Sequence, residues 1–88
     1  MIRALALLLA LASPASAEVC ADRGTILKEL QKQYGEAPVI AALTEDGRVV
    51  EFVATPDGGS WTLLITRPDG TTCALGTGVA WARGGEAV

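Results

Sequence analysis

The chain has 88 residues, half of them hydrophobic, with ten acidic and seven basic side chains, no histidine and a formal net charge of −3. This length allows one domain. Nucleic acids and anionic membranes are excluded as predicted partners, because binding to either needs clustered Lys and Arg. The lack of histidine removes the side chain most often used in general acid–base catalysis.

The first 17 residues have the pattern of a signal peptide. Met1-Ile2-Arg3 carries one cation, Ala4–Ala12 is a run of nine alanine and leucine residues, and Ala15-Ser16-Ala17 offers small residues for cleavage. A core helix is the alternative, but this run has no polar face, and it is shorter than the roughly 20 residues that span a bilayer. We therefore expect cleavage after residue 17, a periplasmic or secreted protein, and no membrane attachment after cleavage.

Two cysteines, Cys20 and Cys73, remain after the predicted cleavage. In an oxidising compartment we expect them to form a disulfide, which small domains often need for stability. Lipid attachment at Cys20 is disfavoured because Glu18 and Val19, rather than small residues, precede it. A reactive thiol is disfavoured because neither cysteine has a histidine, a Cys-x-x-Cys spacing or a basic cluster to lower its pKa.

The segment after Cys20 has the pattern of an amphipathic helix over residues 23–34. Asp22 is a suitable N-cap, and Gly35 is a suitable C-terminal stop in the left-handed conformation. Polar and charged side chains occupy the opposite face of this helix. Apolar residues recur at spacings of three and four: Ile26, Leu27, Leu30 and Tyr34.

The rest of the chain has the pattern of a β-meander. Three Asp-Gly pairs, at intervals of eleven and twelve residues, lie between β-rich segments and are typical of hairpin turns. The sequence predicts an α+β fold with one N-terminal helix packed on a four- to five-stranded antiparallel meander. The single domain is expected over residues 18–83, with a disordered tail over 84–88. The expected strands are 39–44, 48–55, 60–66, 71–75 and, after a glycine-rich break, 79–83.

Strand alternation assigns each side chain to one face of the sheet. Because Glu51 is charged, we expect it to point to water and its neighbours to point toward the helix. The expected core is Val50, Phe52, Ala54, Trp61, Leu63, Ile65, Cys73 and Leu75. The other face then exposes apolar side chains that we interpret as a candidate partner surface: Val49, Val53 and Leu64.

The search for catalytic residues gives no candidate that we retain, and we predict a protein that is not an enzyme. Ser60 has no base nearby in the sequence. A paired-carboxylate hydrolase, with Glu45 or Glu51 and a turn aspartate, needs two acids that converge in a cleft. The turn aspartates lack the alternating spacing of a calcium loop. We expect no cofactor and no metal.

Three segments carry a resemblance to known proteins: "QYGEAPV", "GGSWTLLITRPDGTTC" and "ALGTGVAW". Together they resemble a group of short exported bacterial proteins of unknown function, over about residues 20–81. The resemblance implies export and a small disulfide-linked domain. It implies no activity, and no functional residue is carried over from it.

Two kinds of function remain compatible with these patterns. The first is a non-catalytic interaction module that binds an envelope protein, or a second copy of itself, through a sheet face or edge. The alternative is an inhibitor or accessory subunit of a cell-envelope enzyme that acts through the turn at Pro56-Asp57-Gly58-Gly59.

Overall fold

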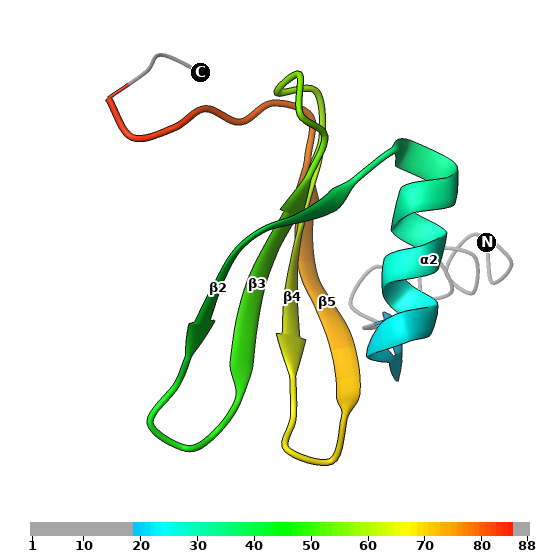
Figure 1. Ribbon diagram of the computed structural model, residues 1–88, viewed down its shortest axis with the longest axis vertical. Helices are drawn as coiled ribbons and strands as arrows, with labels where there is room; N and C mark the ends of the chain where they lie inside the picture. Colours follow the sequence, from blue (N-terminus) through cyan, green and yellow to red (C-terminus); the bar gives the residue numbers. More distant parts are fainter. Residues whose placement is uncertain (1–18, 86–88) are drawn as a thin grey trace, which may run out of the picture.

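The computed structural model describes residues 19–85, which form one helix and a five-stranded antiparallel sheet (Figure 1). The strand order is β1-β5-β4-β3-β2. Strands β2 to β5 therefore form a meander, and β1 pairs with β5 at the edge opposite β2. The α+β class is confirmed, whereas the predicted cleavage site lies outside the described residues. The elements are β1 (Val19–Asp22), α2 (Arg23–Tyr34), β2 (Ala37–Leu43), β3 (Val49–Ala54), β4 (Trp61–Thr66) and β5 (Thr71–Gly78).

The bounds of α2 agree with the prediction, and both ends have the expected caps. The backbone N–H of Thr25 donates to Asp22 Oδ2 at 3.1 Å, and its hydroxyl donates to Asp22 Oδ1 at 2.6 Å. Gly35 has a φ of 71° and donates its N–H to the carbonyl of Gln31 at 2.9 Å. The helix is not the first element, however, because β1 precedes it and ends at the N-cap residue Asp22.

The three predicted hairpin turns are present, and each contains a glycine at positive φ, a conformation that disfavours other residues. The main-chain bond that closes each hairpin joins Thr44 N–H to the Arg48 carbonyl, Thr55 N–H to the Ser60 carbonyl, and Arg67 N–H to the Thr71 carbonyl. The three glycines are Gly47, Gly58 and Gly70.

The fifth strand is not the predicted segment 79–83. It is β1, which pairs with β5 so that Cys20 lies opposite Cys73, and these two cysteines form the predicted disulfide. Residues 79–83 have no strand structure, because Trp81 bonds to the β3–β4 turn instead. Its backbone N–H donates to the Gly58 carbonyl at 3.2 Å, and its indole N–H donates to the Thr55 carbonyl at 2.9 Å.

The helix covers the face of the sheet opposite to the predicted one. Ile26 packs with Val53 and Leu64, both of which have 0% exposure. Glu51, which we expected in water, is only 2% exposed because Arg23 at the start of α2 pairs with it. The alternation of side chains along the strands was predicted correctly, but the prediction of which sheet face the helix covers was wrong.

The register defines the second face, which we call the open face. Phe52 lies opposite Ile40 in β2 and Leu63 in β4, and Val50 lies opposite Ile65. Figure 1 shows α2 on one side of the sheet only. The predicted core residues Val50, Phe52, Trp61, Leu63 and Ile65 are therefore part-buried on the open face. The disulfide lies on the same side, since Cys73 is opposite Ile65 in the register.

Candidate functional site

The predicted partner surface at Val49, Val53 and Leu64 is wrong as an exposed surface. Val53 and Leu64 are fully buried under α2. Val49 is part-buried and shares this face by register, because it lies opposite Thr66, which is itself buried. The apolar surface that the sheet does leave uncovered is on the open face, among residues that we had assigned to the core.

Aromatic side chains gather at one end of the open face. The Phe52 ring stacks on Trp61 with ring centroids 5.8 Å apart and meets Trp81 edge-on at 5.5 Å. Trp61 lies directly over Gly78, where any larger side chain would overlap with the indole ring. Trp81, in the chain after β5, therefore covers part of the open face at β3 and β4. The β2 edge has no such cover, because Ile40, which lies opposite Phe52 in the register, is 67% exposed.

Strand β2 forms an uncharged edge beside the open face. All seven residues of Ala37–Leu43 are exposed, and none carries a charge. The Thr44 N–H bonds to the Arg48 carbonyl across the hairpin. Since bonded and non-bonded pairs alternate along an antiparallel ladder, the main-chain groups of Ala41 and Leu43 point away from β3. These outward N–H and C=O groups can pair with a strand from another chain.

A groove of about 790 Å³ lies on the other side of the sheet, between α2 and strands β1, β4 and β5. Its walls are mostly apolar and include Ile26 and Leu30 from the helix and Leu64 and Ala74 from the sheet. The groove is therefore a part of the helix-covered face that the side chains of α2 do not fill. The sequence patterns gave no sign of the groove.

A buried carboxylate, that of Glu36, lies at the end of the groove beside the C-terminus of α2. Glu36 is 3% exposed. It accepts a hydrogen bond at Oε2 from the Ser60 hydroxyl at 2.6 Å and one at Oε1 from the Thr62 hydroxyl at 2.7 Å. These contacts join the end of the helix to β4. They also bring together two of the segments, "QYGEAPV" and "GGSWTLLITRPDGTTC", on which the resemblance rests.

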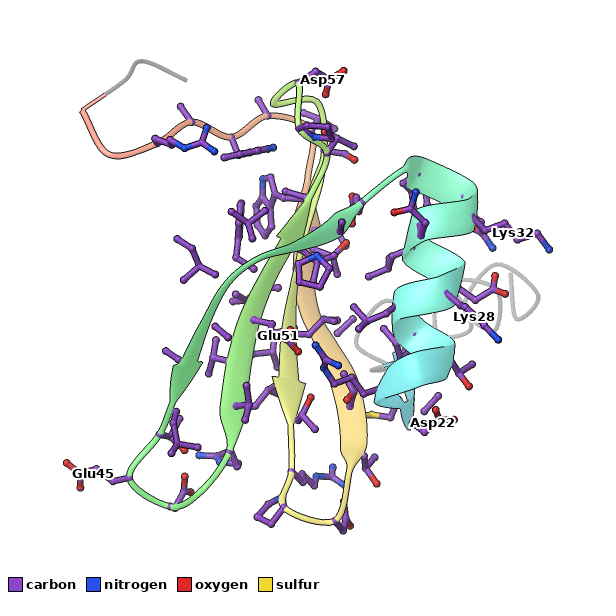
Figure 2. All side chains as sticks on the ribbon, viewed as in Figure 1. Asp22, Lys28, Lys32, Glu45, Glu51 and Asp57 are labelled. Carbon is purple, nitrogen blue, oxygen red and sulfur yellow. A yellow bond between two sulfur atoms is a disulfide. The ribbon has the colours of Figure 1, made fainter. Side chains whose placement is uncertain are left out.

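Replacing Glu36 with Gln should lower the free energy of unfolding by about 1 to 2 kcal/mol, because two charge-assisted hydrogen bonds become neutral ones of about half the strength. Urea unfolding followed by circular dichroism measures the change. Glu45→Gln is the matched control, since Glu45 is exposed in the β2–β3 turn (Figure 2) and should leave stability unchanged. Equal midpoints for both variants would contradict a structural role for the Glu36 bonds.

Three of the acidic residues considered for a paired-carboxylate site, Glu45, Glu51 and Asp57, lie apart from one another. Figure 2 places Glu45 and Asp57 in turns at opposite ends of the sheet, and Glu51 between the sheet and the helix. Hydrogen bonds from Thr55 and from the Gly59 N–H lower the pKa of Asp57. Bonds from Thr25 likewise lower the pKa of the cap residue Asp22. These carboxylates therefore serve turn and cap geometry.

Within residues 19–85, no three His, Cys, Asp or Glu side chains gather where they could hold a metal ion. The one helix in this part of the chain is too short and too polar to cross a bilayer. No protein-family model matches the chain, and the comparisons found no similar curated protein and no similar solved structure. The resemblance to short exported bacterial proteins thus stays a prediction.

Proposed function

We propose that this protein is a small exported interaction module without catalytic activity, which binds another protein of the cell envelope through the open face and the adjoining β2 edge. The observation that carries the proposal is the apolar open face, uncovered near Ile40, next to an edge strand that has no charged residue. The signal-peptide pattern and the Cys20–Cys73 disulfide support export.

Binding would follow the physics of strand addition. A partner strand beside β2 pairs with the outward main-chain groups of Ala41 and Leu43, which supplies affinity. Its side chains on one face then lie against Ile40 and extend the apolar open face. Charged side chains, which commonly protect an edge strand from such pairing, are missing from β2.

Two exposed residues of β2 give a matched test of this proposal. Ile40 is 67% exposed on the open face, and Leu43 is 74% exposed on the other face, since it lies opposite Val49. The tagged, oxidised protein is incubated with an envelope extract, and each captured protein is quantified by mass spectrometry. Ile40→Glu should reduce capture of the partner at least tenfold, whereas Leu43→Gln, which adds no charge to the edge strand, should leave it near the original level.

A third variant separates the edge from the face. Ala41→Pro removes one outward N–H, which edge strands tolerate, and should also abolish capture if a partner strand pairs with β2. Equal capture by all of these variants would refute the proposal. Sedimentation of the purified protein identifies a second copy as the partner if Ile40→Glu shifts a dimer to a monomer.

The alternative role, an inhibitor that acts through the β3–β4 turn, rests on the rigidity of that turn. The Thr55 hydroxyl accepts hydrogen bonds from the N–H groups of Gly59 and Ser60 at 2.9 and 3.0 Å. The Trp81 N–H donates to the Gly58 carbonyl in the same turn. Asp57 is exposed at the tip. Loss of capture with Asp57→Ala, together with normal capture by Ile40→Glu, would favour this alternative.

A further inference from the structure

The groove between α2 and the sheet has the size and lining of a small-molecule site. Its volume of about 790 Å³ falls within the range of roughly 300–1,000 Å³ that such sites occupy. Apolar side chains from α2, β4 and β5 form most of its surface, and a few polar groups converge at the end near Glu36. No residue of β2 lines this groove, so it is separate from the proposed protein-binding edge, although Trp61 borders both the groove and the open face.

The charged groups of the groove are all negative. Its lining contains the carboxylates of Glu29 and Glu36 and no Lys or Arg. The two ion pairs recorded among the described residues join Arg23 to Glu51 and Arg48 to Asp46, so neither uses Glu36. The hydrogen bonds recorded for the Glu36 carboxylate come only from neutral hydroxyls.

The carboxylate of Glu36 still has capacity to accept a hydrogen bond from a ligand. Each of its oxygens accepts one hydroxyl, and a carboxylate oxygen has lone pairs for about two such bonds. A buried charge is costly unless it is paired, and attraction between opposite charges is stronger in an apolar site than in water. A cation that enters from the groove would therefore gain more at Glu36 than at an exposed carboxylate.

From this charge complementarity we propose that the groove binds a small cationic amphiphile, with an ammonium head at Glu36 and an apolar tail along Ile26, Leu30, Leu64 and Ala74. Anionic amphiphiles are repelled by Glu29 and Glu36. Neutral ones gain only the contacts of the tail. This activity does not depend on the open face, and its failure would leave the proposed protein-binding function intact.

Three probes with the same tail and different heads test the proposal: octylamine, octanol and octanoate. Each is titrated into the purified, oxidised protein at neutral pH, below the concentration at which it aggregates, and backbone amide shifts are followed by NMR. Octylamine should bind at least tenfold more tightly than octanol, and octanoate should bind most weakly. The shifts should concentrate at Leu30, Ser60 and Ala74. Equal affinities for the three heads, or shifts confined to the open face, would overturn the proposal.

Two exposed glutamines of α2 provide matched variants that preserve the helix. Gln33 lines the groove, whereas Gln31 does not. Gln33→Lys should weaken octylamine at least fivefold with little effect on octanol, and Gln31→Lys should change neither. Glu36→Gln should remove the preference for the amine over the alcohol. Identical octylamine affinities for the two lysine variants would contradict a site for the ammonium head in the groove.

Discussion

Removing the Cys20–Cys73 disulfide should lower the free energy of unfolding by about 4 kcal/mol. The two cysteines are 53 residues apart in the sequence, and in the chain-entropy model closing a loop of that length removes entropy from the unfolded chain and raises its free energy by about 4 kcal/mol. β1 pairs only with β5 and is four residues long, so it has few other contacts to hold it. Urea unfolding with and without a reducing agent measures the effect.

The matched variant for this measurement is Cys20→Ala/Cys73→Ala, which removes the crosslink without adding thiols. Its midpoint should equal that of the reduced protein and should not respond to reductant. A loss below about 1 kcal/mol, a quarter of the value expected from loop closure, would mean that packing of α2 on the sheet, rather than the crosslink, stabilises the start of the domain.

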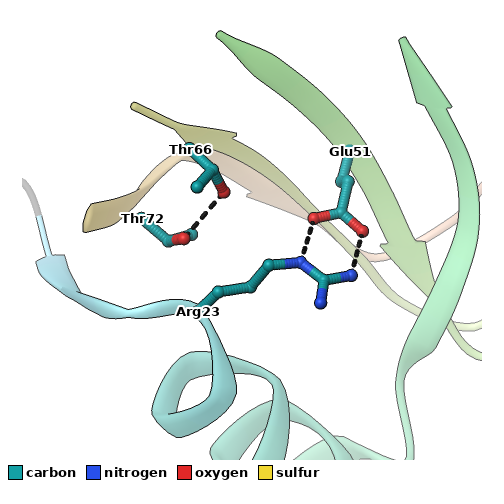
Figure 3. Close-up of polar contacts among 4 residues, drawn as sticks. All are labelled: Arg23, Glu51, Thr66 and Thr72. Atoms are coloured by element: carbon teal, nitrogen blue, oxygen red, sulfur yellow. Dashed lines mark hydrogen bonds and ion pairs between the residues drawn. The ribbon is translucent and has the colours of Figure 1, made fainter. Parts of the chain in front are cut away.

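Replacing Arg23 with Gln should lower the free energy of unfolding by about 3 kcal/mol, the lower end of the range for breaking a buried ion pair. Figure 3 shows the Arg23 guanidinium bound to both carboxylate oxygens of Glu51, each at 2.8 Å. The Glu51 side chain is 3% exposed and the Arg23 side chain 48%. The variant therefore leaves a buried carboxylate without its partner, although water reaches the arginine side of the pair.

The same pair predicts a pH dependence. The hydrogen bonds from Arg23 lower the pKa of Glu51 below its ordinary value of 4.5. A group with a lowered folded-state pKa contributes stability above its unfolded pKa, and that stability is lost as the pH falls through the folded value. Stability should therefore decrease on acidification below about pH 4.5, and Arg23→Gln should reduce this dependence. Unfolding curves recorded from about pH 3 to about pH 7 measure this dependence.

A double variant distinguishes the pair from simple packing. Arg23→Met/Glu51→Leu replaces both charges with apolar side chains and should recover most of the stability lost in Arg23→Gln, because well-packed apolar residues often match a buried ion pair. Stability that falls further in the double variant would show that the sheet needs the carboxylate itself at this position.

The parts of the fold that depend on neighbouring residues could be predicted. The start and end of α2 follow from Asp22 and Gly35, which contact backbone groups within five residues. The hairpins follow from their Asp-Gly turns for the same reason. The position of β1 could not be predicted this way, because its pairing with β5 depends on residues 53 apart in the sequence.

The choice of sheet face that α2 covers could not be predicted from neighbouring residues. A charged residue in a strand usually points to water, and Glu51 does not because Arg23, 28 residues earlier, pairs with it. The signal that was available is the opposite charge of Arg23 in the first turn of the helix. Thr66 and Thr72, hydrogen-bonded at 2.7 Å and buried on the same face, add further polar groups there (Figure 3).

The predicted candidate site was wrong for the same reason, because the two sheet faces were exchanged in the prediction. Val53 and Leu64, which we named as part of a partner surface, belong to the core, and most of the residues that we named as the core lie on the open face. Glu36 was missed for a similar reason: its partners Ser60 and Thr62 are 24 and 26 residues away. A glutamate directly after a helix-ending glycine gives no local sign of burial.

The uncharged edge at Ala37–Leu43 affects the tendency of this protein to self-associate at high concentration. Nothing in that strand itself repels a neighbour. Colloidal stability must then come from the net charge of −3 spread over the whole chain. Repulsion of this kind acts over only about 8 Å at physiological ionic strength and weakens as salt is added, so concentrated brine is the solvent in which the protein is least protected from stacking edge to edge.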